Sequence, residues 1–186
     1  AEFEWNIADS SGVLAFMLAT HVAAETELPV KASSVYDPRY LPELAVDGDP
    51  RTRWASSGAG DEWLLLDLGA SVPVRTLTLN WEHAYALAYR IELSEDAETW
   101  QALVPDGKGV DGQQTLEGLE GRGRYLRIHC TRPGPFPLYS IWEISSADEE
   151  LARALKALGM RFAEAREAAA QEAAKRLSEA VNDLDV

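Results

Sequence analysis

Short apolar runs separated by turn residues dominate the chain between residues 30 and 146. Residues 63–68 form an apolar run that stops at a glycine, and residues 124–130 alternate between two faces. Residues 88–94 and 100–104 read as two strands joined by a hairpin-like turn. Many short strands spaced by turns are typical of a β-sandwich or jelly roll. The pattern therefore predicts a mainly β domain.

The C-terminal part of the chain, residues 147–186, has a different composition. It contains no proline, and Gly159 alone interrupts a run of strong helix formers after Ser146, which we expect to cap a helix. One apolar seam runs along this segment, with large residues at first and mostly alanine afterwards. We expect a long amphipathic helix that either links to a neighbouring domain, docking on it or on its own sandwich, or self-associates as a coiled coil.

The N-terminal residues 1–28 form an extension whose structure the sequence leaves open. Residues 13–25 place apolar side chains at helical spacing and are rich in alanine, which favours a helix. A buried strand or the tail of a preceding domain is an equally valid interpretation. We therefore treat residues 1–28 as a segment separate from the β domain.

The charge balance excludes two classes of partner. The formal net charge is −14 and the pI is about 4.6, so the chain lacks the basic face that nucleic acid requires. The same charge opposes attachment to anionic lipid. Cys130 is the single cysteine, so the chain cannot form an internal disulfide. No apolar run reaches the roughly 18 residues of a membrane span, so we expect no membrane insertion.

A short acidic loop, Asp47-Gly48-Asp49, carries the clearest candidate for ion binding. Gly48 permits a tight turn, and the oxygens of Asp47, Asp49 and Thr52 can converge on one hard cation. Three side chains are too few for a calcium ion, which takes about six to eight oxygens, so carbonyls or a distant carboxylate must complete the shell. The alternative is a simple Asp-Gly turn between two strands.

Several segments, in this order and spacing, resemble the coagulation-factor type C, or discoidin, domain. They are the acidic loop with Trp54, Trp63–Gly69, Leu79–Ala86, Tyr89–Ser94, Glu98–Trp100, Arg124–Ile128 and Tyr139–Glu143. The version that they resemble most is the bacterial carbohydrate-binding module of family 32. The resemblance implies a galactose-binding-like jelly-roll β-sandwich over residues 29–146, followed here by the long C-terminal helix.

The resemblance also implies a structural calcium ion beside the acidic loop. In the family its ligands are a loop carbonyl, acidic side chains, a threonine and groups of the last strand. The matching positions in this chain are Leu44, Asp47, Asp49, Thr52, Trp142 and Glu143. Such an ion would tie the first strands to the last and so stabilise the fold.

Sugar binding in this family uses the loops at one end of the sandwich. It needs aromatic faces for the C–H side of a pyranose and polar groups for its hydroxyls. The residues at matching or loop positions are Tyr36, Arg39, Glu62, Glu82, His83, Tyr85, Arg132, Phe136 and Tyr139. The segment around Glu82 resembles the subgroup that binds glucan or chitosan-type chains, although three prolines replace a glycine-rich final loop. Trp54, Trp63 and Trp100 are expected in the core.

Catalytic patterns are weak in this sequence. The three histidines fall in separate segments without metal-ligand spacing, and a glycosidase pair of Glu82 with Asp61 or Glu62 is the one enzymatic alternative. We therefore expect a non-catalytic carbohydrate-binding module that binds oligo- or polysaccharide. The expected context is a secreted bacterial glycoside hydrolase, outside the cell or in the periplasm, with a neighbouring catalytic domain. The rival interpretation is a protein-interaction or adhesion module of the discoidin type.

Overall fold

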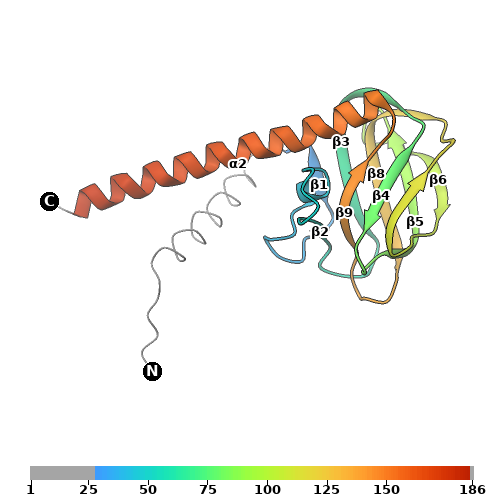
Figure 1. The fold of residues 1–186 in the computed structure, drawn as a ribbon, viewed down its shortest axis with the longest axis horizontal. Helices are drawn as coiled ribbons and strands as arrows, with labels where there is room; N and C mark the ends of the chain where they lie inside the picture. Colours follow the sequence, from blue (N-terminus) through green and yellow to red (C-terminus); the bar gives the residue numbers. More distant parts are fainter. Residues whose placement is uncertain (1–27, 185–186) are drawn as a thin grey trace. The chain divides into compact units, whose positions relative to one another are not determined.

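The computed structural model of the protein describes residues 28–184. The expectation for residues 13–25 lies outside this part. Figure 1 shows two facing β-sheets and one long helix. The elements are β1 (Val30–Ala32), η1 (Pro42–Ala45), β2 (Trp54–Ala55), β3 (Glu62–Val74), β4 (Leu77–Trp81), β5 (Ala86–Ser94), β6 (Gln101–Gly107), β7 (Gly112–Leu116), β8 (Gly121–Pro133), β9 (Ser140–Ser145) and α2 (Glu149–Leu184).

Both sheets are antiparallel. One has the strand order β1-β3-β8-β5-β6 and the other the order β2-β9-β4-β7. The predicted hairpin forms, because Leu93 of β5 pairs with Gln101 of β6. Its turn places Ala97 at φ 61°, and the Asp96 carboxylate accepts the amides of Glu98 and Thr99. The predicted mainly β sandwich with a C-terminal helix is confirmed.

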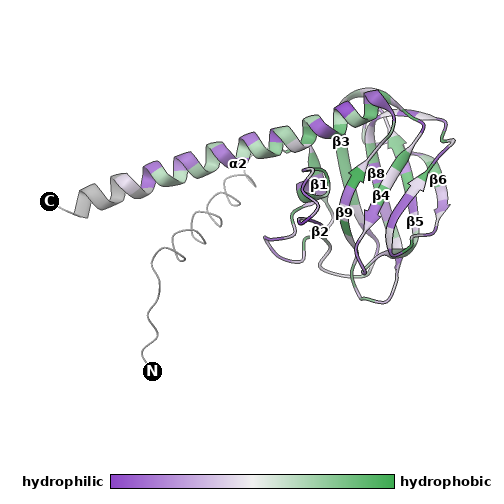
Figure 2. Ribbon diagram, viewed as in Figure 1, coloured by the Kyte–Doolittle hydropathy of each residue, from purple (hydrophilic) through white to green (hydrophobic). Residues whose placement is uncertain are grey.

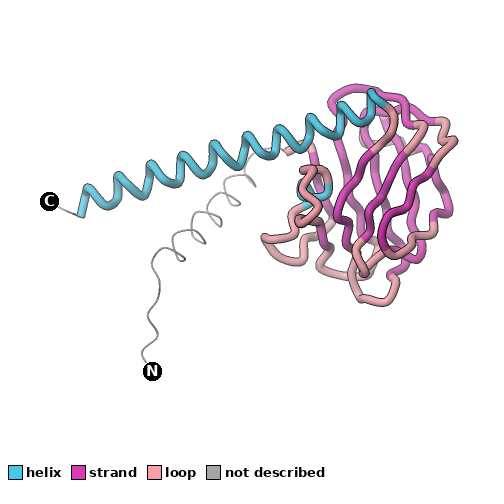
Figure 3. Tube along the Cα trace, in the orientation of Figure 1, coloured by secondary structure: helices cyan, strands magenta, loops and turns pink. Residues whose placement is uncertain are grey.

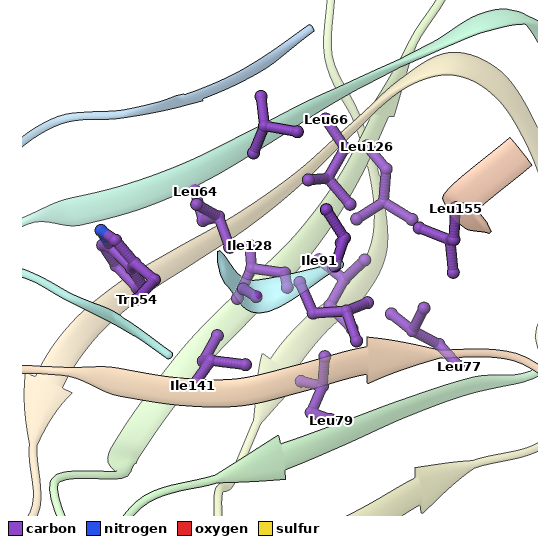
Figure 4. Close-up of a cluster of buried hydrophobic side chains, with 14 of the residues drawn as sticks. Trp54, Leu64, Leu66, Leu77, Leu79, Ile91, Leu126, Ile128, Ile141 and Leu155 are labelled. Atoms are coloured by element: carbon purple, nitrogen blue, oxygen red, sulfur yellow. The ribbon is translucent and has the colours of Figure 1, made fainter. Parts of the chain in front are cut away.

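The core fills the space between the sheets, because inward-facing residues alternate with outward-facing ones along each strand. In Figure 2 this alternation appears as changing hydropathy along the strands. Leu126, Ile128 and Cys130 of β8 are fully buried, as their spacing predicts. Trp54 is also fully buried, and Figure 4 shows its ring beside the aliphatic side chains of both sheets.

The predicted core positions of Trp63 and Trp100 are wrong, because both side chains are only partly buried. Trp63 alternates with the inward-facing Leu64, so it lies on the outer face of the five-stranded sheet. Trp100 lies against the same face, where the Arg127 guanidinium stacks 3.9 Å from the centre of its ring. A cation over the ring thus replaces the hydrophobic contacts of a core site.

Strand β3 is longer than the sequence predicts. An end at Gly69 is expected, but the strand continues to Val74. The position of Gly69 is instead marked by a shift of the β3–β8 register between Asp67 and Val72. Gly69 has φ 80°, and its amide donates to the Asp67 carboxylate, so the irregularity has its own local support. The break comes later, at residues 75–76, where the chain crosses from one sheet to the other.

Helix α2 begins as an integral part of the sandwich. Leu151, Leu155 and Leu158 are at most 4% exposed and belong to the same core cluster as the strands. Figure 4 shows Leu155 pointing toward Leu77 at the end of the sandwich where β4 begins. The compact unit therefore extends from Pro29 to Met160, beyond the expected boundary at residue 146.

The remainder of α2, from Arg161, belongs to a second unit. Among its residues with described side chains, Phe162, Ala169 and Ala173 are buried, and all three belong to the predicted apolar seam. The pair Glu172–Arg176 links successive turns on the outside of the helix. Self-association through this seam stays a prediction.

Candidate functional site

Five connections lie at one end of the sandwich, which we call the loop end (Figure 3, lower part of the strands). They are the residues after β1 and those that join β2 to β3, β4 to β5, β6 to β7 and β8 to β9 (33–41, 56–61, 82–85, 108–111 and 134–139). The antiparallel register places these connections together, because Glu62 at the start of β3 pairs with Cys130 near the end of β8.

Backbone hydrogen bonds join the loops to one another. The Tyr36 amide donates to the carbonyl of Ala55 at 2.8 Å, and the Ser56 amide donates to that of Tyr139 at 2.9 Å. The Gly134 amide donates to the carbonyl of Tyr85, also at 2.9 Å. The first, second, third and fifth loops therefore form one connected surface.

Large hydrophobic side chains are exposed at this end. Tyr36, Leu87, Val110 and Phe136 are 38–56% exposed and lie on or beside these loops. Of the described residues, the one other large exposed hydrophobic is Met160 of α2. The Tyr36 ring meets the Tyr40 ring edge-on, with 5.9 Å between the centroids, which limits how it can turn. Two aromatic rings, those of Tyr36 and Phe136, are thus open to a ligand.

Charged and polar groups lie on or next to the same loops. Arg39 forms a two-pronged ion pair with Asp37, with N–O distances of 2.7 and 3.0 Å. Arg132 is exposed. A Glu82 carboxylate oxygen accepts the amide of Ala84 at 2.9 Å, which fixes the turn between β4 and β5. These groups supply donors and acceptors at fixed places on the loop end.

His83 has a partner that the sequence analysis missed. Its Nδ1 lies 3.0 Å from the carboxylate of Asp111, which comes from the loop between β6 and β7. The hydrogen bond with Asp111 and the negative charges of Asp111 and Glu82 raise the pKa of the His83 ring. The two residues are 28 positions apart, so no local signal in the sequence joins them.

Three of the predicted sugar-contacting residues make contacts within the protein, and one of them is fully buried. Tyr139 is fully buried, and its hydroxyl donates to the carbonyls of Ala59 and Gly60, so its ring cannot stack on a sugar. The Glu62 carboxylate accepts the hydroxyls of Ser33 and Ser34. Tyr85 is half-buried against the core. The predicted sugar contact of Tyr139, which the resemblance implied as one of two aromatic residues of the final loop beside Phe136, is therefore wrong. The contacts of Glu62 and Tyr85, which are only partly buried, stay predictions.

The predicted cation loop is built around Asp47. Its carboxylate accepts the Thr52 hydroxyl at 2.9 Å and the Asp49 amide, also at 2.9 Å. The Gly48 amide, at a φ of 77°, donates to the Glu143 carboxylate at 3.1 Å. Burial raises the pKa of the Glu143 carboxyl to about 7, and the nearby Asp47 charge adds to the rise. The loop thus brings the remote Glu143 beside Asp47.

Two backbone features accompany these carboxylates. Leu44, whose carbonyl is a predicted ligand, is buried in η1 directly before the loop. Asn80 pairs with Glu143 and Trp81 with Ile141, so Trp142 is an extra residue that interrupts the β4–β9 ladder. Such a bulge frees the backbone groups of the extra residue from regular pairing. The carbonyls of Leu44 and Trp142 therefore lie close in sequence to Asp47 and Glu143, respectively.

The Asp49 side chain does not join this group. Its carboxylate forms an ion pair with Arg51, with N–O distances of 2.8 and 2.9 Å, and this pairing lowers the pKa of Asp49 to about 2. The Asp49 carbonyl, in contrast, accepts the Thr52 hydroxyl. Over the described residues, no group of three or more His, Cys, Asp or Glu side chains converges. A cation here would depend on Asp47, Glu143 and neutral oxygens.

Arg53 is a further residue that the sequence analysis missed. Its guanidinium lies between two rings, 4.5 Å from the centre of Tyr40 and 4.7 Å from that of Trp142. This stack connects the loop end to the bulge in β9. No pattern in the sequence around Arg53 predicts that its guanidinium stacks between two aromatic rings.

No catalytic arrangement stands out among the described residues. Cys130 is fully buried, and burial raises the pKa of its thiol, so it is not a nucleophile. Over residues 28–184 no helix is both long and apolar enough to cross a membrane.

Comparison with solved structures identifies similar sandwiches. The chain is 32% identical to chitosan-binding module 1 of a chitosanase/glucanase from Paenibacillus sp. IK-5, with a TM-score of 0.59, over 65% of this chain and 96% of that one. Module 2 of the same enzyme, solved with chitotriose, is 28% identical, with a TM-score of 0.59, over 65% and 98%. The family 32 module of Clostridium perfringens NanJ, solved with galactose, is 18% identical and shows the fold alone (TM-score 0.56, 63% and 90%).

A curated relative comes from Enterococcus faecalis, the polysaccharide lyase 8 family protein HylA. It is 36% identical over 91 residues, which is 49% of this chain but 7% of that protein. The sequence profile of the F5/8 type C domain matches residues 29–144, more than half of the chain. These residues include the loop end and the acidic loop. Because the profile matches more than half of the chain, the chain belongs to the F5/8 type C domain family, in its discoidin-like, carbohydrate-binding-module form.

Proposed function

We propose that this chain is a non-catalytic carbohydrate-binding module that holds a glycan at its loop end. The observation that carries the proposal is that the exposed rings of Tyr36 and Phe136 lie at the same end of the sandwich as Glu82, His83 and Arg132, on or next to loops that backbone hydrogen bonds join. The aromatic rings would stack on sugar rings, and the polar groups would take hydroxyls. The likeness to modules that bind chitosan supports this choice.

Amino-sugar chains are the ligand class that the charges favour. At the loop end the carboxylates of Asp37, Asp61, Glu82 and Asp111 outnumber the cations of Arg39, Lys108 and Arg132, and the whole chain has a net charge of −14. A chain of protonated glucosamine units would meet a favourable field, whereas a uronate chain would be repelled. Binding of an amino-sugar chain should therefore weaken as salt is added.

A panel of immobilised glycans tests this function. The full chain would be applied to chitosan, to a neutral glucan and to a uronate polymer, alongside Phe136→Ala. Met160→Ala is the matched control, since Met160 is similarly exposed but lies on α2. We expect retention on chitosan that is lost in Phe136→Ala and kept in the control. Retention on no glycan, or equal retention of both variants, would reject the proposal.

The parent protein would be a secreted bacterial enzyme that degrades polysaccharide, with this module as an accessory part. The support is that both kinds of relative are parts of larger enzymes, a chitosanase/glucanase and a polysaccharide lyase family protein. A protein-interaction or adhesion role is the second candidate, favoured by Leu87 and Val110, which enlarge the exposed apolar surface at the loop end. Pull-down of a protein partner by a chain that binds no glycan would support this candidate.

We further propose a structural calcium ion at the acidic loop. The fit rests on two neighbouring carboxylates, Asp47 and Glu143, that share one half-buried place with the Thr52 hydroxyl. A divalent ion would relieve their mutual repulsion, and hard oxygens are the ligands that calcium prefers. Asp47, Thr52 and Glu143 would hold it through side chains, with the carbonyls of Leu44, Asp49 and Trp142 as further donors.

A further inference from the structure

Helix α2 begins after residues 29–144, the region that the family profile matches, and hydrogen bonds join its start to the sandwich. The Asp148 carboxylate accepts the amides of Arg75 and Thr76, at 2.7 and 2.9 Å. The Ser146 hydroxyl donates to the carbonyl of Thr76 and accepts the amide of Asp148, so it anchors the turn before the helix. The first three turns of α2 therefore have a defined place on the β domain.

The third turn of α2 touches the backbone of the acidic loop. Gly159 is buried, and a Cβ atom added there would lie 2.4 Å from the carbonyl oxygen of Val46. The same atom would lie 3.1 Å from the Cα of Asp47. Backbone atoms cannot move aside as a flexible side chain can, so only glycine allows the helix to come this close.

Asp47 is thus held from two sides. On one side its carboxylate accepts the Thr52 hydroxyl, and the next residue, Gly48, donates to Glu143. On the other side the helix backbone at Gly159 packs on Val46 and on the Cα of Asp47. Leu158, next to Gly159, is 2% exposed and belongs to the core cluster that includes Val46, which fixes the distance between helix and loop.

We propose that α2 is a working part of the cation site, with Gly159 as a positioning residue for Asp47. This inference rests on the proposed calcium site and is independent of glycan binding. The helix forms the wall behind Val46 and Asp47, so the loop keeps the geometry that calcium needs. Because coupling between two sites is reciprocal, calcium in turn tightens the docking of residues 155–160.

Substitution of Gly159 by alanine tests the proposal, because here it should be unfavourable although the same change favours an exposed helix. In an exposed helix, Gly→Ala is stabilising, because alanine has the higher helix propensity. Here the added methyl must push the helix away from Val46, so we expect Gly159→Ala to weaken calcium binding at least tenfold, measured by calorimetry on metal-free protein. Ala157→Gly is the control, because Ala157 is exposed and this change lowers helix propensity without touching the loop. We expect its calcium affinity to stay within twofold of the wild type.

Hydrogen exchange on the unaltered chain provides a second measurement that does not depend on the folding of a variant. Amides of residues 155–160 should exchange at least threefold more slowly with calcium, while those at the centre of β5 stay unchanged. Equal calcium affinity in wild type and Gly159→Ala would overturn the inference while leaving the cation site intact. Unchanged exchange of residues 155–160 on saturation with calcium would overturn it as well. Absence of calcium binding by the wild type would overturn the cation site and this inference together, but not the glycan function.

Discussion

The Asp148 carboxylate accepts the backbone amide of Thr76 at 2.9 Å and so ties the beginning of α2 to the crossing between β3 and β4. This contact, together with the buried Leu151 and Leu155, makes the start of the helix part of the β domain. The sequence analysis had separated the two at residue 146. The connection could not be predicted, because an aspartate before a helix reads as an ordinary cap and its partner lies 72 residues away.

Truncation measures this contribution. A chain that ends at residue 146 loses Leu151, Leu155 and Leu158, and the removal of one buried leucine side chain costs about 2–5 kcal/mol. The summed loss is of the order of a whole domain's stability, about 5–15 kcal/mol. We expect no cooperative unfolding for residues 28–146 and a cooperative transition for residues 28–160, followed by circular dichroism in urea. Equal stability of the two fragments would show that the helix only lies on the surface.

Calcium should stabilise the chain through Asp47 rather than Asp49. At a calcium concentration 100 times Kd, the stabilisation should be about 2.7 kcal/mol. Asp47→Ala should abolish the resulting rise in Tm, because it removes the carboxylate beside Glu143. Asp49→Ala should keep most of it, because the Asp49 carboxylate faces Arg51.

Thermal melts of metal-free protein, with calcium or with excess chelator, measure these differences. Equal Tm shifts in wild type and Asp47→Ala would contradict the assignment of Asp47 as a ligand. A loss of the shift in Asp49→Ala alone would mean that the Asp49 side chain leaves Arg51 to bind the ion.

Glu43 should make stability depend on pH. It is 5% exposed in η1, and burial raises the pKa of its carboxyl to about 7. A folded-state pKa above the unfolded value of about 4.3 means that the protonated acid favours folding. This stability is fully present below pH 4.3 and is lost as the pH rises through 7. The shift corresponds to about 4 kcal/mol.

Glu43→Gln keeps the size of the side chain and removes the charge. We expect it to be more stable than the wild type at pH 8 and about equal at pH 4, measured by urea unfolding in chelator. Glu98→Gln is the control for net charge, since Glu98 is exposed on the turn after β5. A gain of the same size in both variants at pH 8 would trace the effect to net charge alone.

The parts that the sequence predicted correctly follow from simple periods. Leu126, Ile128 and Cys130 face the core because strand side chains alternate, and the helix follows from composition and an apolar seam. The features that the sequence analysis missed depend on contacts between distant segments. Trp63 lies outward because its neighbour Leu64 takes the inward place, and the burial of Tyr139 depends on the loop that carries Ala59. In the sequence Gly159 only weakens the predicted helix, whereas in the structure it allows the close contact with the backbone of Val46.

Glu82 offers a way to separate charge from loop support. Its carboxylate fixes the turn by accepting the Ala84 amide, and it also adds negative charge to the loop end. Glu82→Gln can retain the hydrogen bond and should weaken binding of chitosan fragments, with less dependence on salt. Glu82→Ala loses both contributions and should weaken binding at least tenfold. Full-strength binding by Glu82→Ala in titration would remove Glu82 from the site.

Calorimetric titration of the full chain with chitosan oligosaccharides tests the central claim, glycan binding at the loop end, most directly. For a shallow site that buries one or two sugar rings, we expect a Kd between about 0.01 and 1 mM. Tyr36→Ala combined with Phe136→Ala should abolish measurable binding with little change in Tm, because both rings are about half exposed, while Met160→Ala should bind like the wild type. Binding of the double variant with unchanged Kd would contradict a glycan site at the loop end.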